Sequence, residues 1–376
     1  MKIIYISKSI IPSRTANSIH VMKMCQAFSD HGHDVTLLAP DVNSQYEKNV
    51  IDVFNFYGTK KNFKIKKLWH PDLKFGAFFY LCSIFFYLFF NKKFDLVYGR
   101  FLHGCYIATI FRNKVIFEAH TPVFKEKIHT LLIFKLLIKN KYFIKMVVIS
   151  KALKSIYLEN GYLNNTKIQV AHDGADEVKS LNSKIQLLGH KNNLKVGYVG
   201  HLYKGKGLEI IASLAKKLDD DIEIHIIGGL EKDINLWREK IINKNVFFYG
   251  FVAPKNVSNY LNALDVCLLP NQEIVFPHGA ESLENTINIS TFTSPLKLFE
   301  YMSHKKPIIA SDMPVIREVL NERNSMLVKC NDTMSWINSI QKLKNSKERE
   351  VIAGQALRDF YKYTWKNRAM SLLWLI

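Results

Sequence analysis

The sequence lacks the features that mark several large classes of protein. Its five cysteines are far apart, odd in number and not at metal-ligand spacing (Cys25, Cys82, Cys105, Cys267 and Cys330). We therefore expect reduced, mostly buried thiols, and neither a zinc site nor a disulfide framework. Low-complexity segments and short-period repeats are also absent, and an apolar content of 48% gives no reason to expect disorder.

No uncharged stretch is long enough for a membrane span. The uncharged run Phe75–Phe90 reads FGAFFYLCSIFFYLFF, whereas a spanning helix needs about 20 residues. This run is expected to be a buried helix or an interfacial segment. The apolar run Ile3–Ile6 is followed by Lys8 and is too short for a secretory leader, so we expect a cytoplasmic protein.

Acidic residues are too few to balance the basic ones. The net charge is +19, and residues 1–180 carry 26 lysines and arginines against 13 acidic residues. A basic face can attract nucleic acid, anionic lipid or a phosphorylated substrate. The alternative is an ordinary solvated surface. Because no nucleic-acid motif is present and the aromatic residues have the pattern of a core, we expect no nucleic-acid partner.

The pattern that is present is a repeated alternation of strand and helix. At 376 residues, the chain is expected to form two domains. Short apolar strands alternate with helical stretches, a pattern typical of parallel sheets covered on both faces. The expected strands are 3–6, 34–38, 96–98, 115–118, 147–149, 168–170, 196–199, 222–227, 246–249, 266–269, 307–310 and 326–328.

The first expected helix follows the first strand, and a Lys/Asn/Leu-rich stretch divides the chain. Asn17 or Ser18 would cap the helix, and Gly32 would end it. The stretch 179–193 has the composition of a linker. We therefore predict α/β domains over residues 1–180 and 190–358. In parallel sheets, ligands bind beyond the carboxyl ends of the strands, so a cleft between two facing domains is where chemistry is expected.

Two loops have the composition of anion sites. Residues 197–207 read GYVGHLYKGKG, where glycines let the backbone approach a phosphate and Lys204 and Lys206 add charge. Residues 293–302 read TSPLKLFEYM, in which Ser294 would cap a helix that begins at Pro295. Each loop is also compatible with an ordinary strand–helix turn, and the first is neither a P-loop nor the usual dinucleotide pattern.

These segments resemble glycosyltransferase family 4 enzymes with the GT-B fold, that is, two facing Rossmann-like domains. The segment SPLKLFEYMSHKKPIIASDMPVIREVL is similar to the family's donor site, and VGYVGHLYKGKGLEII is similar to its phosphate-binding loop. VFFYGFVAPKNVSNYLNALDVCLLPN resembles the segment around its nucleotide pocket, which contains Gly250 and Asn271. YTWKNRAMSLL resembles the C-terminal helix, which in the family crosses back onto the first domain over about residues 360–376.

The resemblance implies a donor site in the C-terminal half. Lys206 matches a lysine that contacts the donor diphosphate, while His201 stands where the family usually has an arginine, with Lys204 as its substitute. Glu300 matches the glutamate associated with ribose, whereas Phe292 occupies the position of the first family glutamate. The further donor-binding candidates are Gly200, Ser294, Pro295 and Leu296, and Lys297 joins Lys206 as a catalytic candidate.

In the N-terminal half the family often has paired glycines after the first strand, where this chain has Pro12–Asn17. The backbone N–H groups of Ala16 and Asn17 would then meet the donor. His120, which follows a strand, resembles the family's cleft histidine and is a catalytic candidate. His20 and Arg100 are acceptor-binding candidates. For His20 and Arg100 the alternatives are a structural histidine and a surface charge.

The resemblance implies metal-independent transfer of a sugar from a nucleotide-diphosphate sugar, with retention at the anomeric carbon. We find no Asp-x-Asp motif in a donor-binding context. The acceptor would be a glycan or a lipid-linked oligosaccharide of capsule, O-antigen or exopolysaccharide synthesis. The alternatives are an epimerase or phosphorylase on the same scaffold, and a non-catalytic binding relative.

A membrane partner is suggested by two segments of the first half. Residues 124–144 read FKEKIHTLLIFKLLIKNKYFI, a basic stretch with apolar residues at partly helical spacing. Together with Phe75–Phe90 it would allow peripheral docking on the anionic inner face of the cytoplasmic membrane. The alternative is a helix packed within the first domain.

Overall fold

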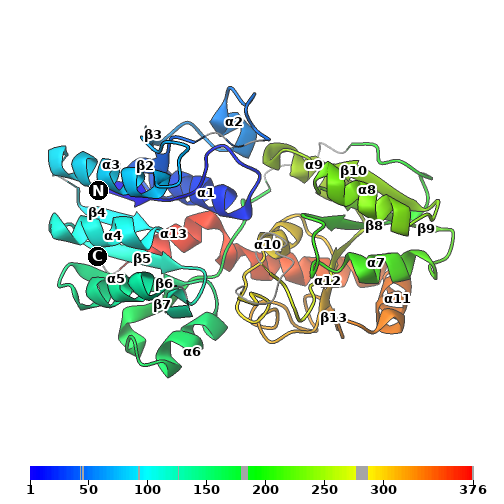
Figure 1. Cartoon of the computed structure of the whole chain (residues 1–376). Coiled ribbons are helices and arrows are strands. Elements are labelled where there is room, and N and C mark those ends of the chain that lie inside the picture. Colours follow the sequence, from blue (N-terminus) through cyan, green and yellow to red (C-terminus); the bar gives the residue numbers. More distant parts are fainter. Residues whose placement is uncertain are drawn as a thin grey trace. The chain divides into compact units, whose positions relative to one another are not determined.

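The computed structural model describes residues 1–42, 44, 46–91, 94–125, 127–178, 185–276 and 287–374. The chain forms two compact units (Figure 1). The first comprises Met1–His172 and Trp365–Ile376, and the second comprises Asp173–Thr364. The first unit therefore ends before the expected linker, of which residues 179–184 lie outside the described part of the chain. Both units are α/β domains built on a parallel sheet, as the sequence predicts.

The first unit contains a seven-stranded sheet in the order β3-β2-β1-β4-β5-β6-β7. Its elements are β1 Lys2–Ile6, α1 Ala16–Asp30, β2 Asp34–Pro40, α2 Val53–Tyr57, β3 Lys64–Leu68, α3 Gly76–Phe90, β4 Leu96–Gly99, α4 Leu102–Ile110, β5 Val115–Ala119, α5 Ile128–Lys139, β6 Phe143–Val148, α6 Lys151–Glu159, β7 Ile168–Val170 and α13 Trp365–Leu373.

The order of the strands reverses at β1, which pairs with β2 on one side and β4 on the other. Right-handed crossovers then place α1 on one face of the sheet and α3, α4 and α5 on the other. On the second face α4 contacts both α3 and α5, and on the first face α13 lies against α1 (Figure 1). The last helix of the chain is thus part of the first unit.

The second unit contains a six-stranded parallel sheet in the order β10-β9-β8-β11-β12-β13. Its elements are β8 Leu194–Val199, α7 Leu208–Ala215, β9 Ile222–Ile227, α8 Glu231–Lys240, β10 Val246–Gly250, α9 Val257–Ala263, β11 Val266–Leu269, α10 Leu296–Ser303, β12 Ile308–Ser311, β13 Met326–Val328, α11 Thr333–Lys342 and α12 Ser346–Phe360. Its core is dense with branched side chains and includes Ile211, Ile224, Ile226, Leu268 and Trp336.

The structure differs from the sequence analysis at three places in the first unit. Helix α1 is capped by Thr15, whose hydroxyl accepts a hydrogen bond from the N–H of Ser18, and not by Asn17 or Ser18. Strand β3 was not predicted, because its sequence KIKKL lies at the edge of the sheet, where alternate side chains reach water. The basic stretch 124–144 is not one helix, since α5 covers only its middle and β6 begins at Phe143.

The run Phe75–Phe90 forms helix α3, which is 15 residues long. Among the described residues, no helix is both long enough and apolar enough to cross a bilayer.

Candidate active site

In the second unit, the loop after β8 follows a path that only glycine permits at its end. Gly207 caps α7 with φ +86°, and a β-carbon at this position would lie 1.9 Å from the carbonyl oxygen of Pro270. Gly205 has φ +87°, and its carbonyl accepts a hydrogen bond from the N–H of Gln272 at 3.1 Å. The loop is therefore held tightly against the loop that follows β11.

Two lysine side chains converge beside this loop. The Nζ atom of Lys297 is buried, lies 3.9 Å from the centroid of the Tyr198 ring and has no hydrogen-bond partner among the described residues. A β-carbon on Gly200 would lie 2.8 Å from that Nζ atom, so the backbone after β8 passes directly over the amine. The Nζ of Lys206 lies 5.1 Å from the Tyr203 ring centroid.

Burial disfavours the charged form of both amines. It lowers the pKa of Lys206 to about 8. Burial also lowers the pKa of Lys297 well below its ordinary value, and the nearby charge of Lys206 lowers it further, while Glu300 opposes both effects. An anion placed between the two amines would relieve this cost, and a diphosphate is an anion of suitable charge.

The helix that carries Lys297 begins one residue later than the sequence predicts. Pro295 is extended (ψ 121°) and is the N-cap, so α10 begins at Leu296. Ser294 does not cap the helix, because its hydroxyl accepts a hydrogen bond from the N–H of Asp173 at 2.9 Å. The first N–H groups of α10 therefore have no partner within the helix, which leaves them available to an anion.

The remaining donor candidates surround the same edge of the sheet. Gly250 ends β10 with φ +73°, and its carbonyl accepts from the N–H of Gly228. Asn271 follows β11 and is buried, and its Oδ1 has no hydrogen-bond partner in the described part of the chain. Glu300 is half-buried one turn after Lys297. The carboxyl ends of β8, β10 and β11 thus contribute to one edge.

The two positions that differ from the family pattern, and the lysine expected to substitute for one of them, have distinct surroundings. Phe292 is buried, with 2% of its surface exposed, so it is part of the packed interior. The ring of His201 stacks on Tyr203 with centroids 5.7 Å apart, and Lys204 is exposed. Lys204 is exposed and His201 is half-buried, whereas the Nζ of Lys297 is buried.

In the first unit, the start of α1 presents free backbone donors. Ala16 and Asn17 are the first two residues of the helix, so their N–H groups have no partner within it. The loop before them is fixed by Tyr57, whose hydroxyl hydrogen-bonds both the N–H and the carbonyl of Ser13. This arrangement is compatible with the predicted approach of a donor.

The two histidine candidates meet at a buried carboxylate. The Nε2 of His120 lies 2.6 Å from Oε1 of Glu118, and the Nε2 of His20 lies 3.0 Å from the same oxygen. The two imidazole rings meet edge to face, with centroids 4.9 Å apart. His20 is buried, whereas the side chain of His120 keeps 19% of its surface exposed. Of the pair, His120 is thus the histidine that a substrate can reach.

Glu118 is neutralised by a residue from the end of the chain. Arg368 in α13 donates to Oε1 of Glu118 at 2.9 Å and also to the carbonyls of His172 and Ala171. Tyr98 donates to the other carboxylate oxygen. Burial by itself would raise the pKa of Glu118, but the Arg368 guanidinium, with the two histidines, holds it well below its ordinary value.

The same side chains are the described group with donor atoms close enough for a metal ion. Its members in the first unit are His20, Glu118 and His120, which offer two ring nitrogens and a carboxylate. The guanidinium of Arg368 supplies a positive charge at the carboxylate of Glu118. The ion pairs that Glu118 makes with Arg368 and His120 hold His120 in one orientation.

Arg100 follows β4, and its backbone N–H bonds the carbonyl of Ile6 at 3.0 Å. Its Nη1 is buried and has no hydrogen-bond partner within the described ranges. A buried guanidinium nitrogen of this kind is compatible with the predicted acceptor role.

Sequence reasoning missed Glu118, Arg368 and Tyr198 as members of the site. Glu118 could have been found, because it is an acidic residue in the otherwise apolar strand VIFEA and such a residue needs a partner. Arg368 gave no local signal, since its partner lies 250 positions earlier in the chain.

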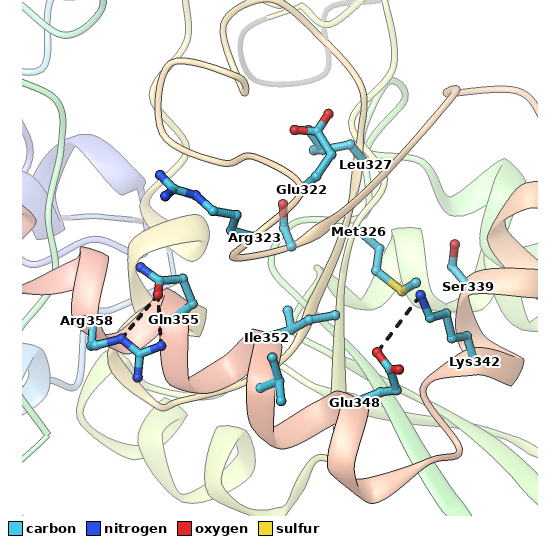
Figure 2. A pocket seen from close by; sticks show the side chains of 12 residues that line it. Glu322, Arg323, Met326, Leu327, Ser339, Lys342, Glu348, Ile352, Gln355 and Arg358 are labelled. Atoms are coloured by element: carbon cyan, nitrogen blue, oxygen red, sulfur yellow. Dashed lines mark hydrogen bonds and ion pairs between the residues drawn. The ribbon is translucent and has the colours of Figure 1, made fainter.

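A separate hollow in the second unit lies away from these residues. It measures about 530 Å³ and is lined by residues before and within β13 and by α11 and α12 (Figure 2). Among its charged side chains, Lys342 pairs with Glu348 and Arg358 donates to Gln355. Because Glu322, Arg323 and Ser325 precede β13, the hollow is at the amino end of that strand, where ligands of parallel sheets do not usually bind.

Comparison with known proteins identifies the class that this architecture represents. A model of the family described as Glycosyltransferase Family 4 matches residues 18–179, and a model described as Glycosyl transferases group 1 matches residues 193–346. Between them the two models cover most of both units. The chain is therefore a glycosyltransferase of the family 4 type, built on the GT-B fold.

Individual relatives agree with this assignment. An uncharacterised glycosyltransferase of Methanocaldococcus jannaschii is 24% identical and aligns over 98% of this chain and 96% of its own length. The Anabaena protein HepE, solved with UDP and glucose, covers 100% of both chains with a TM-score of 0.73 at 14% identity. The lipopolysaccharide outer core galactosyltransferase WaaB also covers 100% of both chains, with a TM-score of 0.65 at 16% identity. At 14% and 16% identity, these two solved structures show that the chain shares their fold, and no more than that.

Proposed function

We propose that this glycosyltransferase moves a sugar from a nucleotide-diphosphate sugar to a glycan or lipid-linked oligosaccharide in cell-surface polysaccharide synthesis. The observation that carries the proposal is the pair of lysines in the second unit. The Nζ of Lys297 is buried without a hydrogen-bond partner among the described residues, and Lys206 is close enough to lower its pKa further. This arrangement fits a bound diphosphate.

The proposed roles of the lysines follow from the charges that form when the bond between the donor sugar and its phosphate breaks. Breaking the bond between sugar and phosphate leaves a nucleotide diphosphate anion and an oxocarbenium-like sugar. The two amines and the first N–H groups of α10 would stabilise the leaving anion, which lowers the barrier. Because these cations are supplied by the protein, we propose that the reaction needs no metal ion.

We propose retention at the anomeric carbon. A same-face attack, in which the leaving phosphate helps to deprotonate the acceptor hydroxyl, requires no carboxylate nucleophile. Phe292 is consistent with this mechanism, because it is buried and apolar at the position where the family has a glutamate. His120, oriented by Glu118, would contact the reacting sugar from the first unit.

The relatives support a uridine nucleotide and a surface glycan. HepE was solved with UDP and with UDP-glucose, and WaaB is described as acting on the lipopolysaccharide outer core. For this chain we therefore propose UDP as the first nucleotide to test, with an acceptor presented at the cytoplasmic face of an anionic membrane.

The test is calorimetric titration of the purified protein with UDP, GDP, ADP and CMP, followed by the same titrations of Lys297→Met. Wild-type protein should bind one diphosphate selectively, and Lys297→Met should weaken that binding at least about tenfold, as expected for a lost charge-assisted contact. Met keeps the volume but removes the buried amine, so the free energy of unfolding should rise by about 1–3 kcal/mol.

Lys244→Met is the matched control, since Lys244 is an exposed lysine of the same unit and its loss should leave binding unchanged. A folded wild-type protein that binds none of the nucleotides would refute the donor proposal. So would a Lys297→Met variant that binds as tightly as wild type.

A further inference from the structure

Helix α3 places an unusual number of aromatic side chains in solvent. Of its 15 residues, the buried ones are Gly76, Tyr80, Ile84 and Leu88, which form the stripe that packs on the sheet side. The outward surface carries five exposed phenylalanines, which are Phe78, Phe85, Phe86, Phe89 and Phe90. A helix on the surface of a soluble domain normally has charged or polar residues there.

The exposed aromatic surface continues beyond the helix. Trp69, Leu73 and Phe75 precede it and are each more than 60% exposed, and Trp69 packs on Phe79 with ring centroids 4.8 Å apart. We call α3 and these three residues the aromatic face. An exposed apolar patch of this extent usually marks an interaction site.

Basic side chains lie next to the aromatic face. A hollow of about 940 Å³ at the end of α3 is lined by aromatic residues of α3 and its C-terminal flank, by lysines of β1 and β3 and by a few further residues: Lys2, Asp34, Thr36, Lys64, Ile65, Lys66, Tyr87, Phe89, Phe90, Asn91 and Phe94. Asp34 is the acidic member of this lining, and it pairs with Lys64 at 3.4 Å. The lining is therefore both aromatic and cationic.

The neighbouring helices on the same face of the sheet show the same combination. Helix α4 contacts α3 and is followed by the exposed Arg112 and Lys114. Helix α5 contacts α4 and exposes Ile128, Leu132 and Leu136 beside the exposed Lys135 and Lys139. Apolar side chains flanked by lysines are the composition that binds an anionic lipid interface.

We infer that the aromatic face docks on an anionic phospholipid bilayer, with the phenylalanines inserted at the headgroup boundary and Lys64 and Lys66 against lipid phosphates. A second copy of the chain would be a poorer partner, because a two-fold contact would bring the lysines of both copies together. The inference deepens the proposed function, since such docking would bring the enzyme to a lipid-linked acceptor.

The test is co-sedimentation of the full-length protein with vesicles of phosphatidylglycerol and phosphatidylcholine, compared with vesicles of phosphatidylcholine alone. Wild-type protein should partition at least about tenfold more strongly onto the anionic vesicles. Phe86→Ser/Phe90→Ser should lose most binding to both compositions. Lys64→Gln/Lys66→Gln should lose only the preference for anionic lipid, by about tenfold or more.

Two control variants make equivalent changes in the second unit. Ile242→Ser/Val351→Ser replaces two exposed apolar residues, and Lys244→Gln/Lys255→Gln removes two exposed lysines. Both should bind vesicles as wild type does.

The inference is overturned if wild-type protein does not bind anionic vesicles, or if control and aromatic-face variants lose binding equally. It is also overturned if the Phe86/Phe90 variant only dissociates an oligomer. Calorimetric titration with UDP should be unchanged in all four variants, which separates this inference from the donor proposal.

Discussion

At the scale of single residues, the second unit keeps the amines of Lys206 and Lys297 in surroundings where burial disfavours their positive charge. Lys206 has a pKa of about 8 because of burial, whereas an exposed lysine has 10.5. A lysine so perturbed is neutral in part at a mildly alkaline pH, and a neutral amine attracts a diphosphate only weakly. Nucleotide binding should therefore respond to pH in a range where most lysines do not.

We predict that the affinity for UDP falls as the pH rises from 7 to 9.5. The diphosphate is fully ionised over most of this range, so the change would come from loss of the proton on Lys206. In the absence of nucleotide, we predict that the free energy of unfolding instead rises with pH over the same range. Between about pH 8 and pH 10.5 the folded state binds fewer protons than the unfolded state, so the destabilisation caused by burying the charged Lys206 is progressively removed and the free energy of unfolding rises. Calorimetric titrations and denaturant unfolding across this range measure both effects.

Lys206→Arg is the control for this prediction, because a guanidinium keeps its charge throughout the range. Its affinity for UDP should vary less with pH than that of wild type. A parallel decline in the two proteins would show that another group is responsible.

At the scale of elements, the loop between β8 and α7 shows how the conformation of a β–α connection depends on its neighbours. Strand β8, the loop and α7 are recognisable in the sequence, yet the conformation of the loop depends on the connection after β11, which contacts Gly205 and Gly207. Glycine is required at Gly207 for two independent reasons, a positive φ and a close carbonyl oxygen.

We predict that Gly207→Ala lowers the free energy of unfolding by more than about 2 kcal/mol and weakens UDP binding, because a methyl group would push the loop that carries Lys206 away from the loop that follows β11. The matched variant is Gly32→Ala. Gly32 has φ +80°, but no atom lies within 4 Å of its added β-carbon. It should therefore lose only about 1 kcal/mol, the backbone cost alone. Chemical denaturation of both variants measures the difference, and equal losses would contradict the proposed role of Pro270.

At the scale of the whole chain, the first unit is completed by the last helix. The guanidinium of Arg368 in α13 reaches the carboxylate of Glu118 in β5, and Trp365 meets the ring of His20 with centroids 5.2 Å apart. The residues that contact His20 and His120 thus come from β5 and from α13, which are far apart in the sequence. The orientation of His120 therefore depends on correct docking of α13, which supplies the cation that pairs with Glu118.

We predict that Arg368→Leu destabilises the first unit by about 3–5 kcal/mol, because Glu118 would be left as a buried carboxylate without its cation. Arg368→Leu combined with Glu118→Leu should recover much of this loss, since neither charge then remains. The rescued protein should still bind UDP but transfer sugar poorly, because His120 has lost its partner. Thermal unfolding, calorimetry and a transfer assay separate these outcomes. If the double variant does not recover stability, the Glu118–Arg368 ion pair is not the contact by which α13 stabilises the first unit.

Most of the parallel architecture could be predicted from the sequence, because buried strands have short apolar runs between helices. The strands 168–170, 222–227, 266–269 and 326–328 begin and end where the apolar runs do. Strand β3 could not be predicted in this way, since an edge strand with alternating lysines has no apolar run. The caps of α1 and α10 were each misplaced by one or more residues, because a serine near a helix start can bond elsewhere, as Ser294 does with Asp173.

The sequence by itself determined the parallel α/β architecture and the residue types of the loop after β8, because glycines, lysines and apolar runs follow local rules of backbone freedom and burial. The class of the protein followed from the resemblance of several segments to glycosyltransferase family 4. The tertiary structure alone decided which charges are partnered. Lys297 is a routine lysine in the sequence and becomes a buried amine over Tyr198 only when β8 and α10 pack together. Glu118 and Arg368 are 250 positions apart and meet only because α13 packs on the first unit. The physical reason is that pKa and pairing depend on distance in space and on exclusion of water, and neither is encoded in local spacing.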